Sequence, residues 1–256
     1  MRPGLCRGLI GIAVLVVLLQ VVPMTPLVNN AYLPPLGDML VELWAQLAAP
    51  AFWFALGDTI RTWATGLAIA LLGGISVGVI IGIVPGLRLI TASTIEFLRP
   101  IPSVALIPLA VLMYGTTTNA TLLLIVYASF WQVLVQILDG VRDIDPVADE
   151  TARSYRLGTA TRIRSLVWPT TLPYALTGVR LAATVALVLA ITGELVIGSP
   201  GLGRQIALAQ SAGAVPAMYG LVIVTGLLGV AVSLAVRAIE RRALRWHVSV
   251  RREVLA

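Results

Sequence analysis

Long apolar runs alternate with short polar segments along this chain. A helix needs about 20 mostly apolar residues to cross the hydrocarbon core of a bilayer. Six segments meet this requirement, and four of them contain no charged residue at all. We therefore predict an all-α integral membrane protein, a bundle of six transmembrane helices in one domain over residues 1–256. The predicted spans are residues 8–28, 62–87, 89–113, 118–138, 176–197 and 217–236.

Two of the predicted spans have alternative or unusual features. The first follows Arg2 and Arg7, and a basic start before an apolar run is also typical of a cleaved signal peptide. No small-residue cleavage site of the A-x-A kind follows it, which favours a retained span. The third span contains three prolines, so neighbouring helices or water must satisfy the carbonyl groups that they free. These are Pro100, Pro102 and Pro108.

The segment between the first two spans, residues 32–61, mixes aromatic and acidic residues. Aromatic side chains favour the membrane interface, so we expect a helix near the outer surface. The second span then carries a small residue at every fourth position, on one helix face where another backbone can approach closely. Static packing is the favoured role of this stripe, and a moving helix contact is the alternative. Its members are Gly66, Ala70, Gly74, Gly78 and Gly82.

Residues 139–172 form the longest polar segment. It has five acidic and five arginine residues, and Asp145 before Pro146 is a helix start signal. We expect a folded loop of two short helices. The acidic and basic residues are Asp139, Asp143, Asp145, Asp149, Glu150, Arg142, Arg153, Arg156, Arg162 and Arg164.

Composition supports the membrane assignment. The chain is 58% hydrophobic and only 12% charged, and its mean hydropathy is +0.94. Soluble domains carry about 25% charged residues. The net charge of +6 comes from arginine alone, since the sequence has no lysine. Arginines beside apolar segments are better explained by the positive-inside bias than by nucleic-acid binding.

The arginines also orient the chain. Six spans place both termini on one side, together with the polar loop, Arg88 and the basic tail. The opposite side has only Arg61 and Arg204. The positive-inside rule then predicts a multi-pass membrane protein with the polar loop and both termini in the cytoplasm.

The inventory of reactive residues argues against an enzyme. One cysteine, Cys6, and one histidine, His247, exclude a metal centre built from His and Cys and an intrachain disulfide. Neither a nucleophile elbow nor a phosphate-binding glycine loop occurs, so any ATP hydrolysis belongs to another polypeptide. We expect no catalytic residue, metal or cofactor in this chain.

Two ionisable residues in the spans are candidates for the transport pathway, because charges within a bilayer usually face protein or a water-filled cavity. Glu194, near the outer end of the fifth span, is either a pathway or gate residue or a structural partner of Arg204, Arg61 or a backbone amide. Arg99 is either an attractant for an anionic solute or the ion-pair partner of Glu96, one turn away, and the pair is favoured.

The polar loop contains the most specific motif. It reads Glu150-Thr151-Ala152-Arg153-Ser154-Tyr155-Arg156-Leu157-Gly158, followed by Trp168-Pro169. This resembles the "EAA" loop of the permease subunits of binding-protein-dependent ABC importers, with Thr151 in place of the first alanine. The resemblance implies a MetI-like permease fold and a coupling helix that docks in a groove of a cytoplasmic ATPase. The coupling residues would be Glu150, Thr151, Ala152, Arg153, Leu157 and Gly158, with Gly158 allowing the turn between the short helices.

Other stretches resemble the nitrate/sulfonate/taurine branch of these permeases. They include the prolines between Arg99 and Leu109, Tyr114-Gly115, Glu194, and Gly201-Leu202-Gly203. The resemblance implies a protein of the bacterial inner membrane, a homodimer with two ATPase copies and an extracytoplasmic solute-binding protein. It implies import of sulfonates, taurine, nitrate or a related small solute by alternating access.

Three rival functions remain at this stage. An ion-gradient-driven secondary transporter often has inverted repeats, and none is visible here. A membrane-embedded hydrolase or transferase needs clustered reactive groups, which the sequence lacks. An ABC permease for another cargo, such as a quaternary amine or a metal chelate, differs only in the solute.

Overall fold

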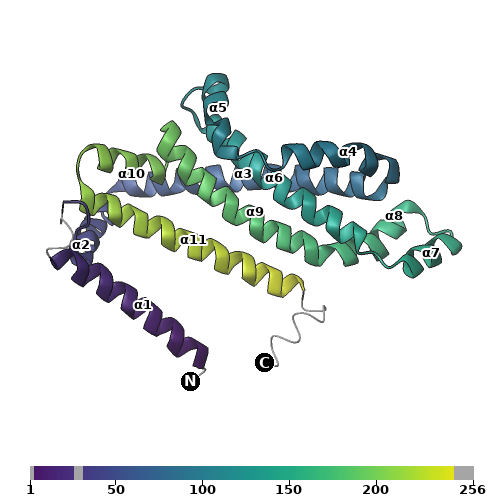
Figure 1. Cartoon of the computed structure of the whole chain (residues 1–256), viewed down its shortest axis with the longest axis horizontal. Coiled ribbons are helices and arrows are strands. Elements are labelled where there is room, and N and C mark those ends of the chain that lie inside the picture. The colour runs from purple at the N-terminus through teal and green to yellow at the C-terminus, as the bar shows by residue number, and fades with distance from the viewer. Residues whose placement is uncertain (1–2, 26–30, 245–256) are drawn as a thin grey trace.

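The computed structural model describes residues 3–25 and 31–244, and this part of the chain is helical without strands. The all-α prediction is therefore confirmed, and Figure 1 shows long helices lying side by side in an elongated bundle. The longer elements are α1 (Pro3–Val21), α2 (Leu36–Leu47), α3 (Pro50–Ile83), α4 (Pro85–Leu98), α5 (Ile107–Tyr114), α6 (Thr118–Arg142), α7 (Pro146–Ser154), α9 (Trp168–Ile197), α10 (Leu202–Ser211) and α11 (Val215–Ala243). The short elements are η1 (Val22–Met24), η2 (Ser103–Leu106), α8 (Thr159–Arg162) and η3 (Ile163–Val167).

Within the described residues, four helices are long and apolar enough to cross a membrane, or five spans if one bent pair counts as a span. The four are α3, α6, α11 and the continuous helix of residues 159–197. The helix α1 lies over the first predicted span, whose last residues, 26–28, fall outside the described part. Arg2 and the tail residues Arg245, His247, Arg251 and Arg252 also lie outside it. The count of six spans stays a prediction.

The predicted span over residues 89–113 is broken by a sharp bend in its proline-containing part. Its helix α4 ends at Leu98, and the chain resumes in η2 and α5 at an angle of 81° to α4. The cause is the pair Pro100 and Pro102, because proline cannot donate the next helical hydrogen bond and Pro102 has an extended backbone. The Leu98 carbonyl, which Pro102 leaves without its helical donor, accepts hydrogen bonds from the Ile101 amide at 3.2 Å and from the Tyr127 hydroxyl of α6 at 2.7 Å.

Two other boundaries differ from the sequence-based expectation. The helix α3 already begins at Pro50, so only α2 is a separate helix in the segment 32–61. The fifth predicted span begins at residue 176, whereas α8, η3 and α9 form one continuous helix from Thr159. The polar loop therefore contains one free-standing short helix, α7, and a second short segment that extends a spanning helix.

The small residues of α3 determine how α3 packs on α6. A methyl group added at Gly66, Gly74 or Gly78 would come within 3.0 Å of a side chain of α6. The opposed pairs are Gly66 with Ile125, Gly74 with Val133, Gly78 with Ile137 and Gly82 with Val141. Residue numbers rise together in every pair, so the two helices run parallel in a constant register. The stripe is thus a packing surface.

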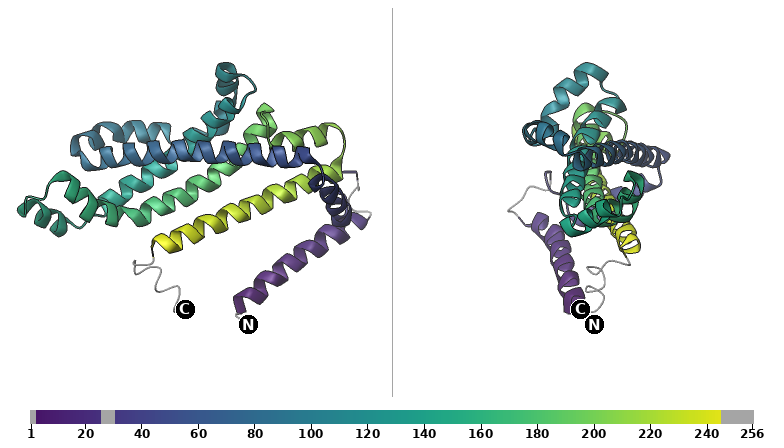
Figure 2. Two further views of the ribbon diagram at one scale, coloured as in Figure 1. Left: turned by 180° about the vertical axis from the view of Figure 1, so that it is seen from behind. Right: turned by 90° about the vertical axis from the view of Figure 1, so that its right-hand side faces the viewer.

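The helix α9 packs antiparallel against α6. Gly140 of α6 meets Thr171, and Gly193 of α9 meets Thr121. Buried side chains of α3, α6, α9 and α11 form the main hydrophobic core between these helices. The two further views in Figure 2 show α3, α6 and α9 as a central layer, with α4 and α5 on one side and α11 on the other. The break between α4 and α5 therefore faces the central helices.

Candidate functional site

The predicted coupling loop lies at one end of the bundle, remote from α2 and α10 (Figure 1). The helix α7 begins at Asp145, whose side chain accepts a hydrogen bond of 2.8 Å from the Val147 amide. An N-terminal cap of this kind stabilises a short helix by about 1 kcal/mol. Pro146 at the first helical position agrees with this start.

Ionic contacts hold α7 against the start of the next helix. Asp149 accepts a hydrogen bond of 2.7 Å from the Arg162 side chain, and a salt bridge of 2.9 Å joins it to Arg153. Both contacts are partly exposed, so each adds little stability by itself. The Arg162 contact ties α7 to the helix that continues into α9, and the Arg153 salt bridge lies within α7 itself.

Most of the predicted coupling residues form an exposed surface. Glu150, Thr151, Arg153, Leu157 and Gly158 are exposed. Ala152 is buried, and its carbonyl accepts a hydrogen bond from the Leu157 amide that closes the turn. A hollow of about 540 Å³ opens on this loop, and it is lined by apolar as well as polar side chains. Its exposed apolar residues include Val147, Tyr155 and Leu157, which are 69%, 78% and 42% exposed.

The reason given for Gly158 from the sequence is wrong. Its backbone has φ −61° and ψ 154°, which any residue adopts, and a Cβ there would meet no atom of the described residues within 4 Å. The left-handed position of the turn is Arg156, with φ 53°. Nothing in the part of the chain that the structure describes requires glycine at residue 158.

Glu194 lies in a second polar cluster, at the other end of α9. The side chain is 0% exposed, and its Oε2 accepts hydrogen bonds from the Thr59 hydroxyl at 2.8 Å and the Gly203 amide at 3.0 Å. The Thr59 hydroxyl in turn accepts a bond from the Leu202 amide. The Oε1 atom has no hydrogen-bond partner in the described part of the chain. Of the partners considered from the sequence, a backbone amide is the one present.

The glycines beside Glu194 allow this contact. Gly201 has φ 149°, and a Cβ there would overlap the Glu194 carboxylate. A Cβ at Gly203 would overlap the Ile191 carbonyl. The motif Gly201-Leu202-Gly203 therefore serves the close approach of α10 to α9, and the Glu194 carboxylate caps the start of α10.

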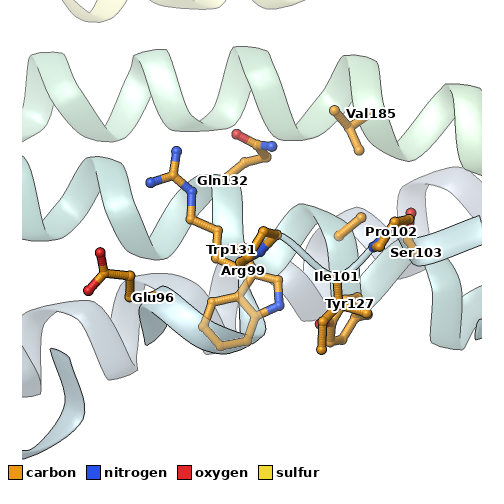
Figure 3. Close-up of a pocket in the computed structure, with 11 residues that line it drawn as sticks. Glu96, Arg99, Ile101, Pro102, Ser103, Tyr127, Trp131, Gln132 and Val185 are labelled. Atoms are coloured by element: carbon orange, nitrogen blue, oxygen red, sulfur yellow. The ribbon is translucent and has the colours of Figure 1, made fainter. Parts of the chain in front are cut away.

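Arg99 lies elsewhere, at the break after α4. It lines a cavity of about 510 Å³ between the break and the helices α6 and α9. Figure 3 shows Glu96, Arg99, Trp131 and Gln132 toward one end of this cavity, and Ile101, Pro102, Ser103, Tyr127 and Val185 toward the other. A second cavity of about 300 Å³ shares Glu96 and Arg99 and extends to Arg88 and Asp139. The structure does not bring Arg99 and Glu194 together.

The favoured pairing of Arg99 with Glu96 is wrong. Among the described residues, neither side chain makes a salt bridge or a hydrogen bond. The two side chains extend in different directions in Figure 3. Arg99 ends α4 and still has a helical backbone, so the two residues keep helical spacing and their side chains are nevertheless unpaired.

Trp131 and Gln132 are lining residues that the sequence did not single out. They lie in a charge-free span, where no polar pattern distinguishes them from lipid-facing residues. One signal was present: Tyr127, Ala128, Trp131 and Gln132 recur at helical spacing and share one face of α6.

The chain is similar to known transport proteins in sequence and in fold. The model of the family described as "Binding-protein-dependent transport system inner membrane component" matches residues 70–245. The taurine transport system permease protein TauC of Escherichia coli K12 is 30% identical over 92% of this chain and 88% of its own length. A putative aliphatic sulfonates transport permease protein, SsuC of Bacillus subtilis 168, is 25% identical over 97% and 90%. The bicarbonate transport system permease protein CmpB of Synechococcus elongatus is 30% identical over 76% and 70%.

Solved structures agree on the fold. The MetNI methionine ABC transporter in an inward-facing conformation has a chain with a TM-score of 0.65 and 16% identity, covering 76% of this chain and 98% of that one. An amino acid ABC transporter with histidines gives a TM-score of 0.62 at 22% identity, covering 75% and 94%. The predicted MetI-like fold is confirmed.

Proposed function

Because this chain belongs to the family of binding-protein-dependent transport system inner membrane components, we propose that it imports small sulfonates or related anions as the permease of an ATP-driven transporter. The chain is a multi-pass membrane protein of the ABC permease class. The proposal adds the cargo, the direction of transport and the partners. Under this proposal the chain is not an enzyme, and a separate ATPase supplies the energy for transport.

The exposed surface of α7 is the observation that carries the coupling part of this proposal. An apolar surface beside charged groups, on a short helix at one end of the bundle, is typical of a helix that docks in a groove of a partner. The contact of Asp149 with Arg162 ties α7 to the helix that becomes α9, so a push on α7 is transmitted to a spanning helix. We assign ATPase coupling to Glu150, Thr151, Ala152, Arg153, Leu157 and Gly158.

Gly158 provides a sharp test of this docking. Because its backbone suits any residue and its surroundings are open, Gly158→Asp leaves the fold of this chain intact. A glycine that the chain itself does not need is explained by close approach of a partner. We expect Gly158→Asp and Glu150→Lys to reduce retention of the co-expressed ATPase roughly tenfold or more in a detergent pull-down, as loss of a buried interface contact does.

The matched control is Gly37→Asp in the first turn of α2, at the opposite end of the bundle, where an added Cβ meets only ordinary contacts. It should retain the ATPase as wild type does. Equal ATPase binding by wild type and the Gly158 variant would contradict the coupling assignment. If wild type retains no ATPase at all, an ion-gradient-driven secondary transporter becomes the better hypothesis.

The cargo assignment rests on the relatives. The name of TauC gives taurine as its solute, the name of SsuC gives aliphatic sulfonates, and the name of CmpB gives bicarbonate. We propose a solute of this kind for the present chain, delivered by an extracytoplasmic binding protein. Competition for ATP-dependent uptake by taurine, ethanesulfonate, nitrate and bicarbonate in proteoliposomes with the ATPase and binding protein separates these cargoes.

We also propose that two copies of the chain form the transport unit with two ATPases. The helix α1 supports this, because it stands apart from the central layer and exposes apolar side chains along its described length (Figure 1). These side chains include Ile10, Val14, Leu15, Val16, Val17 and Leu18. Native mass spectrometry of the purified permease–ATPase complex would count the copies. Glu194, buried at the junction of α3, α9 and α10, is retained as a candidate gate residue that acts by holding these helices together.

A further inference from the structure

The cavity at the α4–α5 break holds two charges that the chain itself leaves unmatched. Arg99 and Glu96 both line it, and within the described residues neither has an ionic or hydrogen-bonding partner for its side chain. Charges at membrane depth are costly unless they meet a partner or water. A cationic and an anionic group, unpaired with each other but open to the same cavity, present complementary charges to a ligand that carries both signs.

A buried donor of the same cavity is also without a partner. The Trp131 Nε1 atom is buried, and it donates no hydrogen bond in the part of the chain that the structure describes. A buried polar group left without a partner costs about 1–3 kcal/mol. The indole is held in place by edge-to-face contacts with Tyr127 and Phe130, at centroid distances of 6.0 and 5.1 Å. Tyr127 is in turn tied to the Leu98 carbonyl, so this wall is rigid.

The size and lining of the cavity limit the class of ligand that it can hold. A volume of about 510 Å³ is within the range of small-molecule sites and far exceeds what a bare inorganic anion fills. The end away from the charges is mostly apolar, with Ile101, Pro102 and Val185. Residues three apart in a helix have Cβ atoms roughly 5–6 Å apart, so the charges of Glu96 and Arg99 suit a short molecule with its two charges close together.

We infer that this cavity is a solute-binding station for a small zwitterion whose oxyanion contacts Arg99 and Trp131 and whose ammonium group contacts Glu96. Gln132 offers a further donor to the oxyanion. This inference rests on the proposed function and specifies its solute class as aminosulfonates or related zwitterions rather than simple anions.

Direct binding tests the station. The full-length permease in complex with its ATPase, in lipid nanodiscs without binding protein, is titrated with taurine, ethanesulfonate and ethylammonium by calorimetry. Wild type should bind taurine more tightly than either singly charged probe. Arg99→Gln should weaken taurine binding roughly tenfold or more, because a charge-assisted hydrogen bond is lost. Trp131→Phe, which keeps the ring and removes the donor, should weaken it about fivefold.

Glu96→Gln gives the most specific outcome. It should weaken taurine binding and leave ethanesulfonate binding unchanged, so that the preference between the two probes disappears. The matched control is Arg88→Gln, an arginine of the same helix that lines only the second cavity, and it should bind taurine as wild type does.

The inference is overturned if Arg99→Gln or Glu96→Gln binds all three probes as wild type does, or if Arg88→Gln loses as much affinity as Arg99→Gln. It is equally overturned if wild type does not distinguish taurine from ethanesulfonate. The proposed function fails separately, through loss of ATPase retention. A complex that assembles and hydrolyses ATP but shows no response to these variants therefore counts against the station alone.

Discussion

Several polar side chains in this bundle form hydrogen bonds with backbone groups that lack a helical partner. The Tyr127 hydroxyl compensates the carbonyl freed by Pro102, and the Glu194 carboxylate receives the first amides of α10 directly and through Thr59. In the hydrocarbon core of a bilayer, an unsatisfied backbone group has no water with which to form a hydrogen bond. These side chains therefore hold the irregular segments of the chain in place.

Replacement of Glu194 separates its structural role from its charge. Glu194→Ala leaves the Gly203 amide and the Thr59 hydroxyl without their acceptor and opens a void, so we expect the free energy of unfolding to fall by about 2–4 kcal/mol. Glu194→Gln keeps an acceptor oxygen and should lose less than half of that. Apparent Tm in detergent, measured by intrinsic fluorescence, checks both. Equal losses would mean that the negative charge itself, rather than the acceptor, holds α10.

At the scale of elements, the parallel contact of α3 with α6 depends on the missing side chains of α3. Helices in lipid have little hydrophobic force to drive them together, so close packing supplies the association. Each glycine of the stripe admits a β-branched or other side chain from α6, and the constant offset between partners keeps the register over the whole length.

Alanine substitutions at two neighbouring glycines of α3 separate the effect of helix packing on stability from the effect of helix propensity. A Cβ at Gly74 would lie 2.8 Å from the Val133 Cβ, whereas one at Gly73 would lie at an ordinary 3.6 Å from the Phe130 ring. We expect Gly74→Ala to cost about 1–3 kcal/mol, because α3 must move away from α6. Gly73→Ala should be neutral or stabilise by up to about 1 kcal/mol through helix propensity. Thermal unfolding of the two variants under the same conditions measures this, and equal effects would exclude a packing role for the stripe.

At the scale of the whole molecule, the helices are arranged so that the arginine-rich segments come to the same end. The loop from Arg142 to Arg164 and the end of α11 with Arg237, Arg241 and Arg242 lie toward one end, while α2 and α10 lie at the other (Figure 1). The positive-inside rule predicts that the arginine-rich end faces the cytoplasm. Arg180 also pairs with Glu240 of α11, at 3.5 Å.

Cysteine labelling tests this orientation. With Cys6 replaced by serine, the chain has no other thiol, so single cysteines report their own side of the membrane. Tyr155→Cys on α7 and Ser211→Cys at the end of α10 are both at exposed positions. A membrane-impermeant maleimide should label Ser211→Cys in intact cells and Tyr155→Cys only after permeabilisation. The reverse pattern would contradict the assignment.

Many features of this protein could be predicted from the spacing of residues along the sequence. Charge-free runs define helices because lipid demands about 20 apolar residues per crossing, and the α3 stripe indicates a packing face because period-four small residues share one side of a helix. The loop motif from Glu150 to Gly158 located the exposed helix α7. Each of these inferences depends only on local spacing, which the sequence displays directly.

The tertiary structure decided what depends on distant residues meeting. The burial of Glu194 against Thr59 and the cavity shared by Arg99, Glu96 and Trp131 join segments far apart in the chain. The size of the bend after Leu98 is also a feature of the structure, although its prolines are visible in the sequence. Local spacing favoured an Arg99–Glu96 pair, yet the two side chains are unpaired and line a cavity with residues of α6. Hydrophobic pattern assigns a residue to the membrane, but only the packing of helices decides whether it faces lipid, another helix or a cavity.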